Sequence, residues 1–490
     1  MGGAVQSIDW WAVAPTLTLA ITAIVVLLVD AFLGPPRTRA RALVPATLTV
    51  LGIVAAAVAA VSLRGETRST FCVESTVCSY VVDPFTLVFW AIVLFGTAVV
   101  ALLGTAAIGD GATPQGEWNF LLLCSATGAM AIAASRDLIT LVVSLEVVSL
   151  PAFALVGLHR GDAKSAEAAV KFFLVSVIST AVMLMGVSLV YGVTGSVFLD
   201  QIDTALASGA SPVRVAVAGT LLTIVGLAFK VAAVPFHMWV PDTYVGAPVA
   251  IAAYLSVVSK AAGFVGLMLV LTFGLQSFVD VWAPLMAVLA ALTMTIGNVL
   301  ALWQQHAVRL LAWSSVAQAG YILVPFGAAA SAPSALGASL GYLTIYAFVN
   351  LGAFAVAAVV GTRYPRQRLS DYRGLIREKP GAGWALAFAL VALAGLPPGI
   401  VGLFAKVVVF DAAAGTVTWL AVVMAINVVI GLVYYARWLM ELFRPADVEA
   451  GSTYDVPIGV GVAIGMTFTA GILFSVFPGL LLDPVLAILR

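Results

Sequence analysis

Four of the six lysines of this 490-residue chain lie inside long apolar stretches, and two glutamates lie in similar surroundings. These residues are Lys171, Lys230, Lys260, Lys406, Glu146 and Glu167. A charge at the centre of a bilayer costs about 2.5–3.5 kcal/mol on insertion scales, and burial favours the uncharged amine of a lysine. Such a lysine can take up and release a proton near neutral pH. These residue types in these positions therefore predict a proton relay.

The position of each charged side chain within its apolar stretch decides how well a relay role explains it compared with simpler explanations. A lysine near a helix end can extend its amine to the membrane surface, which stays an alternative for Lys171. Glu167 precedes it by four residues, the order that favours a local ion pair. The other three lysines lie deep in their stretches. A carboxylate at the depth of Glu146 needs a cationic partner from another helix, and Lys230 is the best candidate.

Prolines interrupt two of these stretches close to a lysine. Pro235 lies five residues after Lys230, and Pro397–Pro398 come shortly before Lys406. Proline cannot donate to the carbonyl four residues earlier, so the carbonyls of residues 393–394 lose their helical partners. Irregular backbone at membrane depth is tolerated where it is buried in protein or lines a wet cavity. One break in each half of the chain is typical of a transporter built from inverted repeats; ordinary kinks are the alternative.

Two histidines lie on the line between these sites. His237 follows the first break, and His306 begins a later apolar stretch. Such a residue more often makes a hydrogen bond between helices than takes part in a relay. We include both as secondary relay candidates, together with Lys171 and Glu167.

The composition requires a membrane protein. Of all residues 62% are apolar and 9% are charged, whereas a soluble domain carries about 25% charged residues. The formal net charge of zero predicts no nucleic-acid partner. Three cysteines and three histidines are too few and too scattered for an iron–sulfur or haem site, and no nucleotide-binding or metal motif is recognisable. We expect no cofactor and no metal in this chain, and energy from partner subunits or an ion gradient.

Apolar stretches of about 20 residues predict transmembrane helices. Fourteen such stretches make the predicted fold class all-α and polytopic. They are residues 12–33, 43–63, 84–108, 119–134, 137–158, 166–193, 213–236, 248–273, 281–303, 308–329, 335–361, 382–411, 416–440 and 457–480.

Basic residues gather in the loops after odd-numbered spans, which places those loops in the cytoplasm. Examples are Arg37, Arg39, Arg41 and the loop 363–379. Both termini are then expected on the outer side of the membrane. The outer loop 64–83 holds Cys72 and Cys78, for which a disulfide and two free thiols remain equal alternatives.

Several motifs resemble the antiporter-like membrane subunits of proton-pumping NADH:quinone oxidoreductase, respiratory complex I. The longest and most specific is the run 229–248, FKVAAVPFHMWVPDTYVGAP, which resembles the broken-helix motif of that family. Residues 137–146, 309–315 and 394–398 support the resemblance, which covers essentially the whole chain. Within the family the chain is most similar to the subunit N branch, which includes mitochondrial subunit 2.

The resemblance implies two inverted five-helix repeats with broken helices 7 and 12. The expected divisions are 1–118 for helices 1–3, 119–273 and 274–443 for the two repeats, and 444–490 for the last helix. The resemblance also implies relay roles for the buried charges. Glu146 and Lys230 would form a charged pair, Lys260 the central relay and Lys406 the distal gate. Relatives often carry histidine at the position of Gln318, so we expect no relay step there, and water or His306 could substitute.

The activity implied is proton translocation driven by quinone reduction in partner subunits that hold FMN and iron–sulfur clusters. The Ala-, Val- and Arg-rich composition suggests a high-GC bacterium and menaquinone as the substrate of the whole enzyme. The implied partners are an antiporter-like neighbour, a small carboxylate-bearing subunit, the lateral helix of the largest member, and the lipid of a bacterial plasma membrane. Two alternatives are a subunit of a multisubunit cation/proton antiporter and an inert scaffold. Lys406, where the antiporter pattern has glutamate, argues against the first, and the buried lysines argue against the second.

Overall fold

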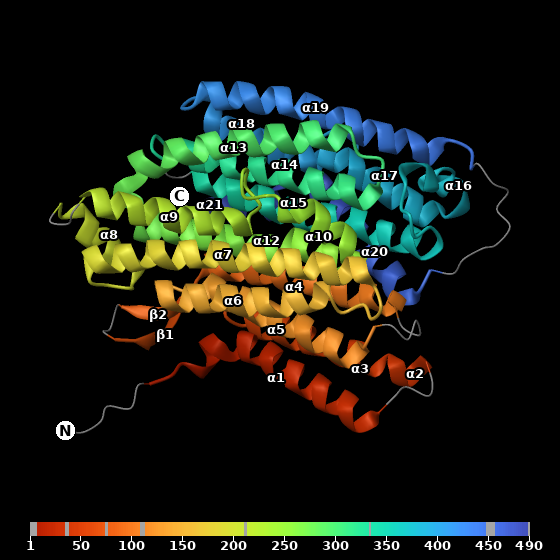
Figure 1. The fold of residues 1–490 in the computed structure, drawn as a ribbon, viewed down its shortest axis with the longest axis horizontal. Coiled ribbons are helices and arrows are strands. Elements are labelled where there is room, and N and C mark those ends of the chain that lie inside the picture. Colours follow the sequence, from red (N-terminus) through yellow and green to blue (C-terminus); the bar gives the residue numbers. More distant parts are fainter. Residues whose placement is uncertain are drawn as a thin grey trace.

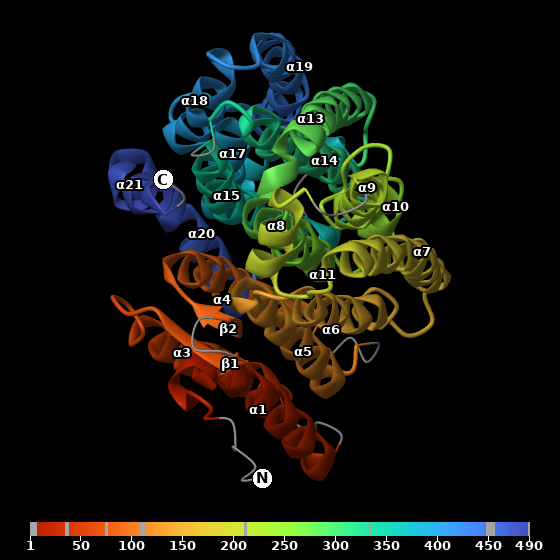
Figure 2. The ribbon, with the colours of Figure 1, turned by 90° about the vertical axis from the view of Figure 1, so that its left-hand side faces the viewer.

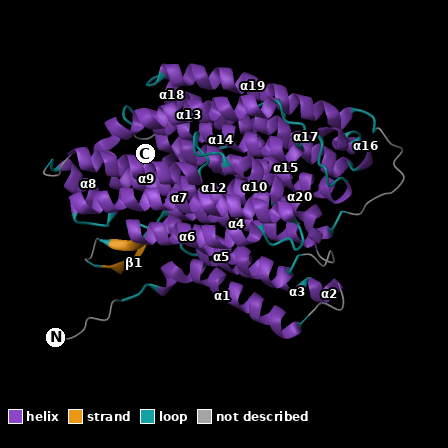
Figure 3. Cartoon of the chain, viewed as in Figure 1, coloured by secondary structure: helices purple, strands orange, loops and turns teal. Residues whose placement is uncertain are grey.

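The structure is a computed structural model that describes residues 7–34, 39–73, 77–107, 113–209, 213–332, 335–446 and 456–488. In these parts the chain is almost entirely helical (Figure 3). Long helices run side by side along one direction, with their ends gathered at two opposite faces of the molecule (Figure 1). Thirteen helical segments of the described chain are long and apolar enough to cross a membrane. The predicted all-α, polytopic fold class is confirmed.

Among the described residues, the first half of the chain forms nine α-helices up to the first break and two after it. They are α1 (Trp10–Leu33), α2 (Arg39–Ala42), α3 (Val44–Val61), α4 (Pro84–Gly104), α5 (Gln115–Ala134), α6 (Leu138–Val156), α7 (Ala163–Thr194), α8 (Leu199–Ala207), α9 (Val213–Lys230), α10 (Trp239–Gly246) and α11 (Val249–Tyr254).

The second half continues the bundle. Its helices are α12 (Lys260–Leu269), α13 (Val279–Leu302), α14 (Ala307–Ala328), α15 (Leu336–Arg363), α16 (Leu375–Glu378), α17 (Pro380–Ala394), α18 (Ile400–Ala414), α19 (Thr418–Phe443), α20 (Ile458–Val476) and α21 (Gly479–Ala487). The π-helical segment η2 (Leu255–Ser259) joins α11 to α12, and a second one, η3 (Val270–Gly274), continues α12 to the end of the span Val249–Gly274.

The predicted twelfth span, 382–411, is divided between α17 and α18, and each has only 15 residues. This broken helix completes the predicted set of fourteen spans beside the thirteen continuous ones. The predicted seventh span is also shorter than expected, because α9 ends at Lys230 and turns follow it to α10. Both breaks therefore occur where prolines interrupt the apolar stretches.

Aspartate side chains begin several of the spans. Asp83, Asp137 and Asp162 accept hydrogen bonds from backbone N–H groups in the first turns of α4, α6 and α7. The first N–H groups of a helix have no partner within it, and a capping carboxylate satisfies one or two of them. These caps fix the ends of helices that are otherwise too uniformly apolar to define their own boundaries.

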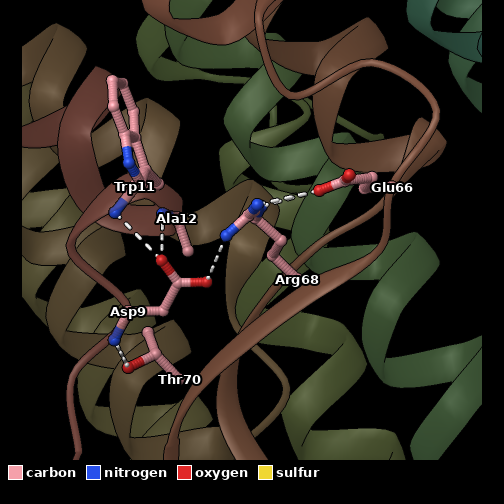
Figure 4. A network of polar contacts seen from close by, with 6 residues as sticks. All are labelled: Asp9, Trp11, Ala12, Glu66, Arg68 and Thr70. Carbon is pink, nitrogen blue, oxygen red and sulfur yellow. Dashed lines mark hydrogen bonds and ion pairs between the residues drawn. The ribbon is translucent and has the colours of Figure 1, made fainter.

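One feature of the predicted outer loop is not helical. Strands β1 (Arg68–Cys72) and β2 (Cys78–Val82) form an antiparallel hairpin, which the sequence prediction missed. A disulfide joins Cys72 to Cys78, which decides between the two alternatives left open above. Arg68 of this hairpin pairs with Asp9, the residue that caps α1 (Figure 4). Arg37, one of the residues used to predict orientation, lies outside the described residues, and the orientation stays a prediction.

Burial is uneven across the bundle. Side chains of α14 and α15 are almost all buried, whereas α1 and α7 expose most of theirs. Seen along the helices, α1 and α19 lie at opposite edges of the molecule (Figure 2). The interior elements, which include both breaks and the π-helical span, therefore hold the buried charges.

Candidate proton relay

Lys230 is the last residue of α9, and its amine lies among side chains of α6 and α7. Its Nζ donates to Ser149 Oγ at 2.6 Å and to Ser176 Oγ at 3.0 Å. Glu146 Oε1 lies 4.0 Å from the same Nζ and accepts a hydrogen bond from Thr180 Oγ1 at 2.8 Å. The Lys230 side chain is 8% exposed and that of Glu146 is 29% exposed. The predicted charged pair is thus brought together, at the outer limit of an ion pair, with hydroxyl groups around the amine.

Packing holds this end of α9 close to α12. A Cβ added to Gly263 would lie 2.9 Å from the Cβ of Lys230. Only a residue without a side chain allows this approach, because real Cβ atoms do not come so near. Gly263 lies one helical turn from Lys260, so the close contact sets the first relay lysine beside the turn that carries the second.

Lys260 is 1% exposed and lies at the junction of η2 and α12. Its Nζ donates to the backbone oxygen of Ser315 at 2.7 Å and to Ser315 Oγ at 3.2 Å. Among the described residues no carboxylate forms an ion pair with it. In the preceding turn, Ser256 Oγ accepts a hydrogen bond from Asn350 Nδ2 at 2.8 Å. The central lysine is therefore surrounded by neutral polar groups from α14 and α15.

Lys406, on α18, binds directly to the broken end of α17. Its Nζ donates to the carbonyl of Leu393 at 2.9 Å and to that of Ala394 at 2.7 Å. These are the two carbonyls that Pro397 and Pro398 leave without helical donors. The break between α17 and α18 therefore builds the acceptor site of its own lysine.

A chain of hydrogen bonds leads from the Lys260 region toward Lys406. Ser314, adjacent to Ser315, shares a hydrogen bond with the Tyr435 hydroxyl. Gln318 Nε2 donates to the Tyr435 hydroxyl at 3.1 Å and to the Leu393 carbonyl at 3.3 Å. Leu393 is also the acceptor of Lys406. Gln318 thus lies between the two lysines, and whether a proton passes there stays a prediction.

The secondary candidates lie apart from these three lysines. Lys171 Nζ pairs with Glu167 at 2.7 Å and with Asp242 at 3.5 Å, and its side chain is half exposed. His237 lies in the turn after α9, where its ring packs on Trp313 at 5.4 Å between centroids. Among the described residues no ion pair or hydrogen bond joins either of them to Lys230, Lys260 or Lys406.

His306 caps the start of α14, where its Nδ1 accepts from the N–H of Arg309 at 3.4 Å. Burial, and then the charge of Arg309, lower the pKa of His306. Gln318 lies twelve residues further along the same helix, which is about 18 Å at 1.5 Å per residue. His306 therefore does not reach the partners of Gln318, and it does not substitute for a histidine at that position.

Sequence reasoning missed the neutral partners of the lysines. They are Ser149, Ser176, Ser315 and the backbone carbonyls of residues 393–394. It also missed Thr180, which donates to Glu146, and Tyr435, which accepts from Gln318. Only Ser149 carried a usable signal, because it lies three residues after Glu146 and so shares its helix face.

Comparisons with known proteins identify the family of this chain. The family described as "NADH:quinone oxidoreductase/Mrp antiporter, TM" matches residues 135–431. A Streptomyces griseus protein named NADH-quinone oxidoreductase subunit N 2 is 54% identical, over 97% of this chain and 92% of its own length. The chain belongs to the antiporter-like membrane subunits of NADH:quinone oxidoreductase. A Salinispora tropica subunit N is 43% identical over 92% of this chain and 88% of its own.

Solved structures of antiporter-like subunits share the fold. A chain of respiratory complex I from Thermus thermophilus matches with a TM-score of 0.77 and 28% identity, over 96% of this chain and 98% of its own. A chain of the Mrp complex from a Dietzia species matches with a TM-score of 0.83 and 21% identity, over 98% of this chain and 97% of its own. At that identity the second likeness shows the fold alone.

Proposed function

We propose that this chain is a proton-translocating subunit of the membrane arm of NADH:quinone oxidoreductase, and that Glu146, Lys230, Lys260 and Lys406 carry the protons. The observation that supports this most is the burial of three lysines inside the bundle, each hydrogen-bonded to neutral groups of other helices or of a broken helix end. Buried lysines are costly in a membrane and mark ion pathways by default. An inert scaffold would have no use for them.

The surroundings of Lys230 allow its charge to change. A carboxylate at 4.0 Å favours the protonated amine, and moving it away leaves desolvation to favour proton release. The hydroxyls of Ser149 and Ser176 accept hydrogen bonds from the ammonium and can donate to the amine once it is neutral. A shift of Glu146 relative to Lys230 would therefore release a proton toward Lys260.

The redox chemistry belongs to other subunits in this proposal. Among the described residues, no group of three or more His, Cys, Asp or Glu side chains could hold a metal ion. FMN and iron–sulfur clusters in partner subunits would oxidise NADH and reduce a quinone, for which menaquinone is our choice. The neighbours proposed for this chain are an antiporter-like subunit, a small carboxylate-bearing subunit and the lateral helix of the largest member.

The proposed location is a bacterial plasma membrane, with both termini on the outer side. Within the chain, 119–273 and 274–443 would be the two inverted repeats, flanked by 1–118 and 444–490. The 54% identity to a protein named subunit N supports a role in NADH:quinone oxidoreductase over a role in a cation/proton antiporter.

A substitution at the central lysine tests the proposal. In inverted membrane vesicles, Lys260→Gln should abolish NADH-driven proton uptake and lower quinone reduction, because an amide cannot hold an exchangeable positive charge. Lys164→Gln, the same change at an exposed lysine, is the control and should leave both unchanged. An assembled Lys260→Gln enzyme that pumps at the wild-type rate would contradict the proposal.

A further inference from the structure

A large apolar groove lies on the flank of the bundle, away from the relay. It has a volume of about 880 Å³ and is lined by side chains of α3, α4, α15, α20 and α21. Figure 2 shows α3 and α21 on the two sides of α4. The volume lies within the range of ordinary ligand pockets, about 300–1,000 Å³. None of the relay residues lines it, so the groove needs an explanation of its own.

The groove extends through only part of the membrane. Its lining on α4 runs from Pro84 to Ala98, fifteen residues that span about 21 Å. This is more than the depth of one leaflet of hydrocarbon, about 15 Å, and less than the full core of about 30 Å. Toward the other end of α4, Gly459 of α20 lies against Thr105 and Leu102 and closes the space. A spanning helix of a partner would need a groove that continues to both faces.

A single cation lines the open end. Arg64 lies in the turn after α3, is exposed, and forms no ion pair with any described residue. The nearby Arg68 is different, because Asp9 and Glu66 neutralise it at 3.0 and 2.8 Å. An apolar trough that extends somewhat beyond one leaflet, with a guanidinium at its mouth that no described carboxylate neutralises, matches an amphiphile with acyl chains and an anionic head.

The floor of the groove is pre-formed. Phe348 of α15 and Phe474 of α20 pack on each other at 5.5 Å between ring centroids. Ala91, on α4, is exposed toward the groove and leaves room above that floor. This aromatic floor and the small side chain of Ala91 above it favour a long, thin apolar ligand.

We propose that this groove is a binding site for one phospholipid of the leaflet at the hairpin end, with acyl chains along α4 and the phosphate on Arg64. The lipid would fill a surface that otherwise stays exposed between α3 and α21. The proposal is independent of the proton relay, because it uses none of its residues.

The test is lipid binding to the intact complex, purified through a tag on this chain and stripped of lipid in detergent. Native mass spectrometry would count bound dioleoylphosphatidylglycerol and, separately, dioleoylglycerol, which has the same chains and no phosphate. Arg64→Gln should weaken binding of the phospholipid about tenfold, as expected for a charge-assisted contact, and leave the diacylglycerol unchanged. Ala91→Trp should abolish one bound copy of both. Arg214→Gln, at another exposed arginine, is the control and should change neither.

Two results would overturn the proposal. One is an unchanged phospholipid count in Arg64→Gln, which decides the matter even where Ala91→Trp fails to assemble. The other is a partner polypeptide in the groove, detected as a cross-link from a photoreactive group at residue 91 to protein instead of lipid.

Discussion

At the break after α9, Lys230 faces two hydroxyls and a carboxylate, whereas at the break between α17 and α18, Lys406 faces two backbone carbonyls. The first site contains a titratable partner that can approach or withdraw. The second contains only fixed dipoles at the end of a helix, where the partial charge is negative. The two halves of the chain therefore hold a lysine at a break by different means, and of the two described sites only the first has a carboxylate within 4.0 Å of the amine.

This difference indicates where a coupling signal from a partner subunit can act on the chain. A neighbouring subunit that shifts Glu146 changes the electrostatic field at Lys230 directly. Lys406 has no such partner among the described residues, and its amine binds the carbonyls of Leu393 and Ala394, the first of which also accepts from Gln318. We expect the first site to respond to charge substitutions and the second to changes of backbone packing.

The largest expected effect is a packing defect at the second break. A Cβ at Gly402 would overlap the backbone carbonyl of Ala392, whereas at Gly263 it would meet the Lys230 side chain. Gly402→Ala should cost about 3 kcal/mol or more, and Gly263→Ala about 1–3 kcal/mol. Thermal unfolding of the purified complex and the amount of assembled subunit would measure both. Equal losses of stability in Gly402→Ala and Gly263→Ala would contradict the proposed difference between the two breaks.

Removal of Lys406, the lysine at the second break, should also lower the stability of the complex. Lys406→Met keeps the length of the side chain but leaves the carbonyl of Ala394 without a donor, at about 1–3 kcal/mol for a buried group. The carbonyl of Leu393 keeps only the amide of Gln318, at 3.3 Å. At the first site, Glu146→Gln retains a hydrogen-bond acceptor for Thr180 and should cost less than 1 kcal/mol. Proton uptake should fall at least tenfold in both. A Lys406→Met complex as stable as Glu146→Gln would show that the carbonyl site is not structurally important.

The smallest expected effect lies outside both breaks, at the cap of α1. Burial raises the pKa of Asp9. The hydrogen bonds from Arg68 and from the N–H groups of Ala12 and Trp11 lower it by more, so the net pKa lies below the ordinary value of an aspartate (Figure 4). A folded-state pKa below the unfolded value stabilises the fold above about pH 4 and loses this contribution as the pH falls through the folded value.

Asp9→Asn should therefore lower the free energy of unfolding by about 1 kcal/mol or less at pH 7. The difference from wild type should shrink as the pH falls below 4. Thermal unfolding in detergent at a series of pH values measures it, and proton pumping at pH 7 should be unchanged. A difference that grows on acidification would contradict the assigned direction.

Much of this site follows from residue types alone. Charged residues in apolar stretches predicted the buried lysines, and prolines predicted both breaks and the two carbonyls left without helical donors, although not that Lys406 binds them. The approach of Glu146 to Lys230 was also predicted, because a buried carboxylate needs a cation. These inferences succeed because the energetic cost of an unpaired charge or carbonyl in a membrane leaves few arrangements open.

The partners from distant helices were not predictable in the same way. Tyr435 and Ser315 meet the relay through the packing of α19 and α14 on the centre. A helix that is apolar on all sides gives no periodic signal of which face points inward. The hairpin was missed because β1 and β2 are five residues each, too short for alternation to stand out.

The central claim is that Lys230 must release a proton under the control of Glu146, and Lys230→Arg tests it most directly. Arginine keeps the positive charge near Glu146 but does not give up its proton in this range. We expect the Lys230→Arg complex to assemble, with quinone reduction and proton pumping lowered together. NADH oxidation by an artificial acceptor at the peripheral subunits should continue. An assembled Lys230→Arg complex with wild-type quinone reduction and pumping would exclude Lys230 from the proton path.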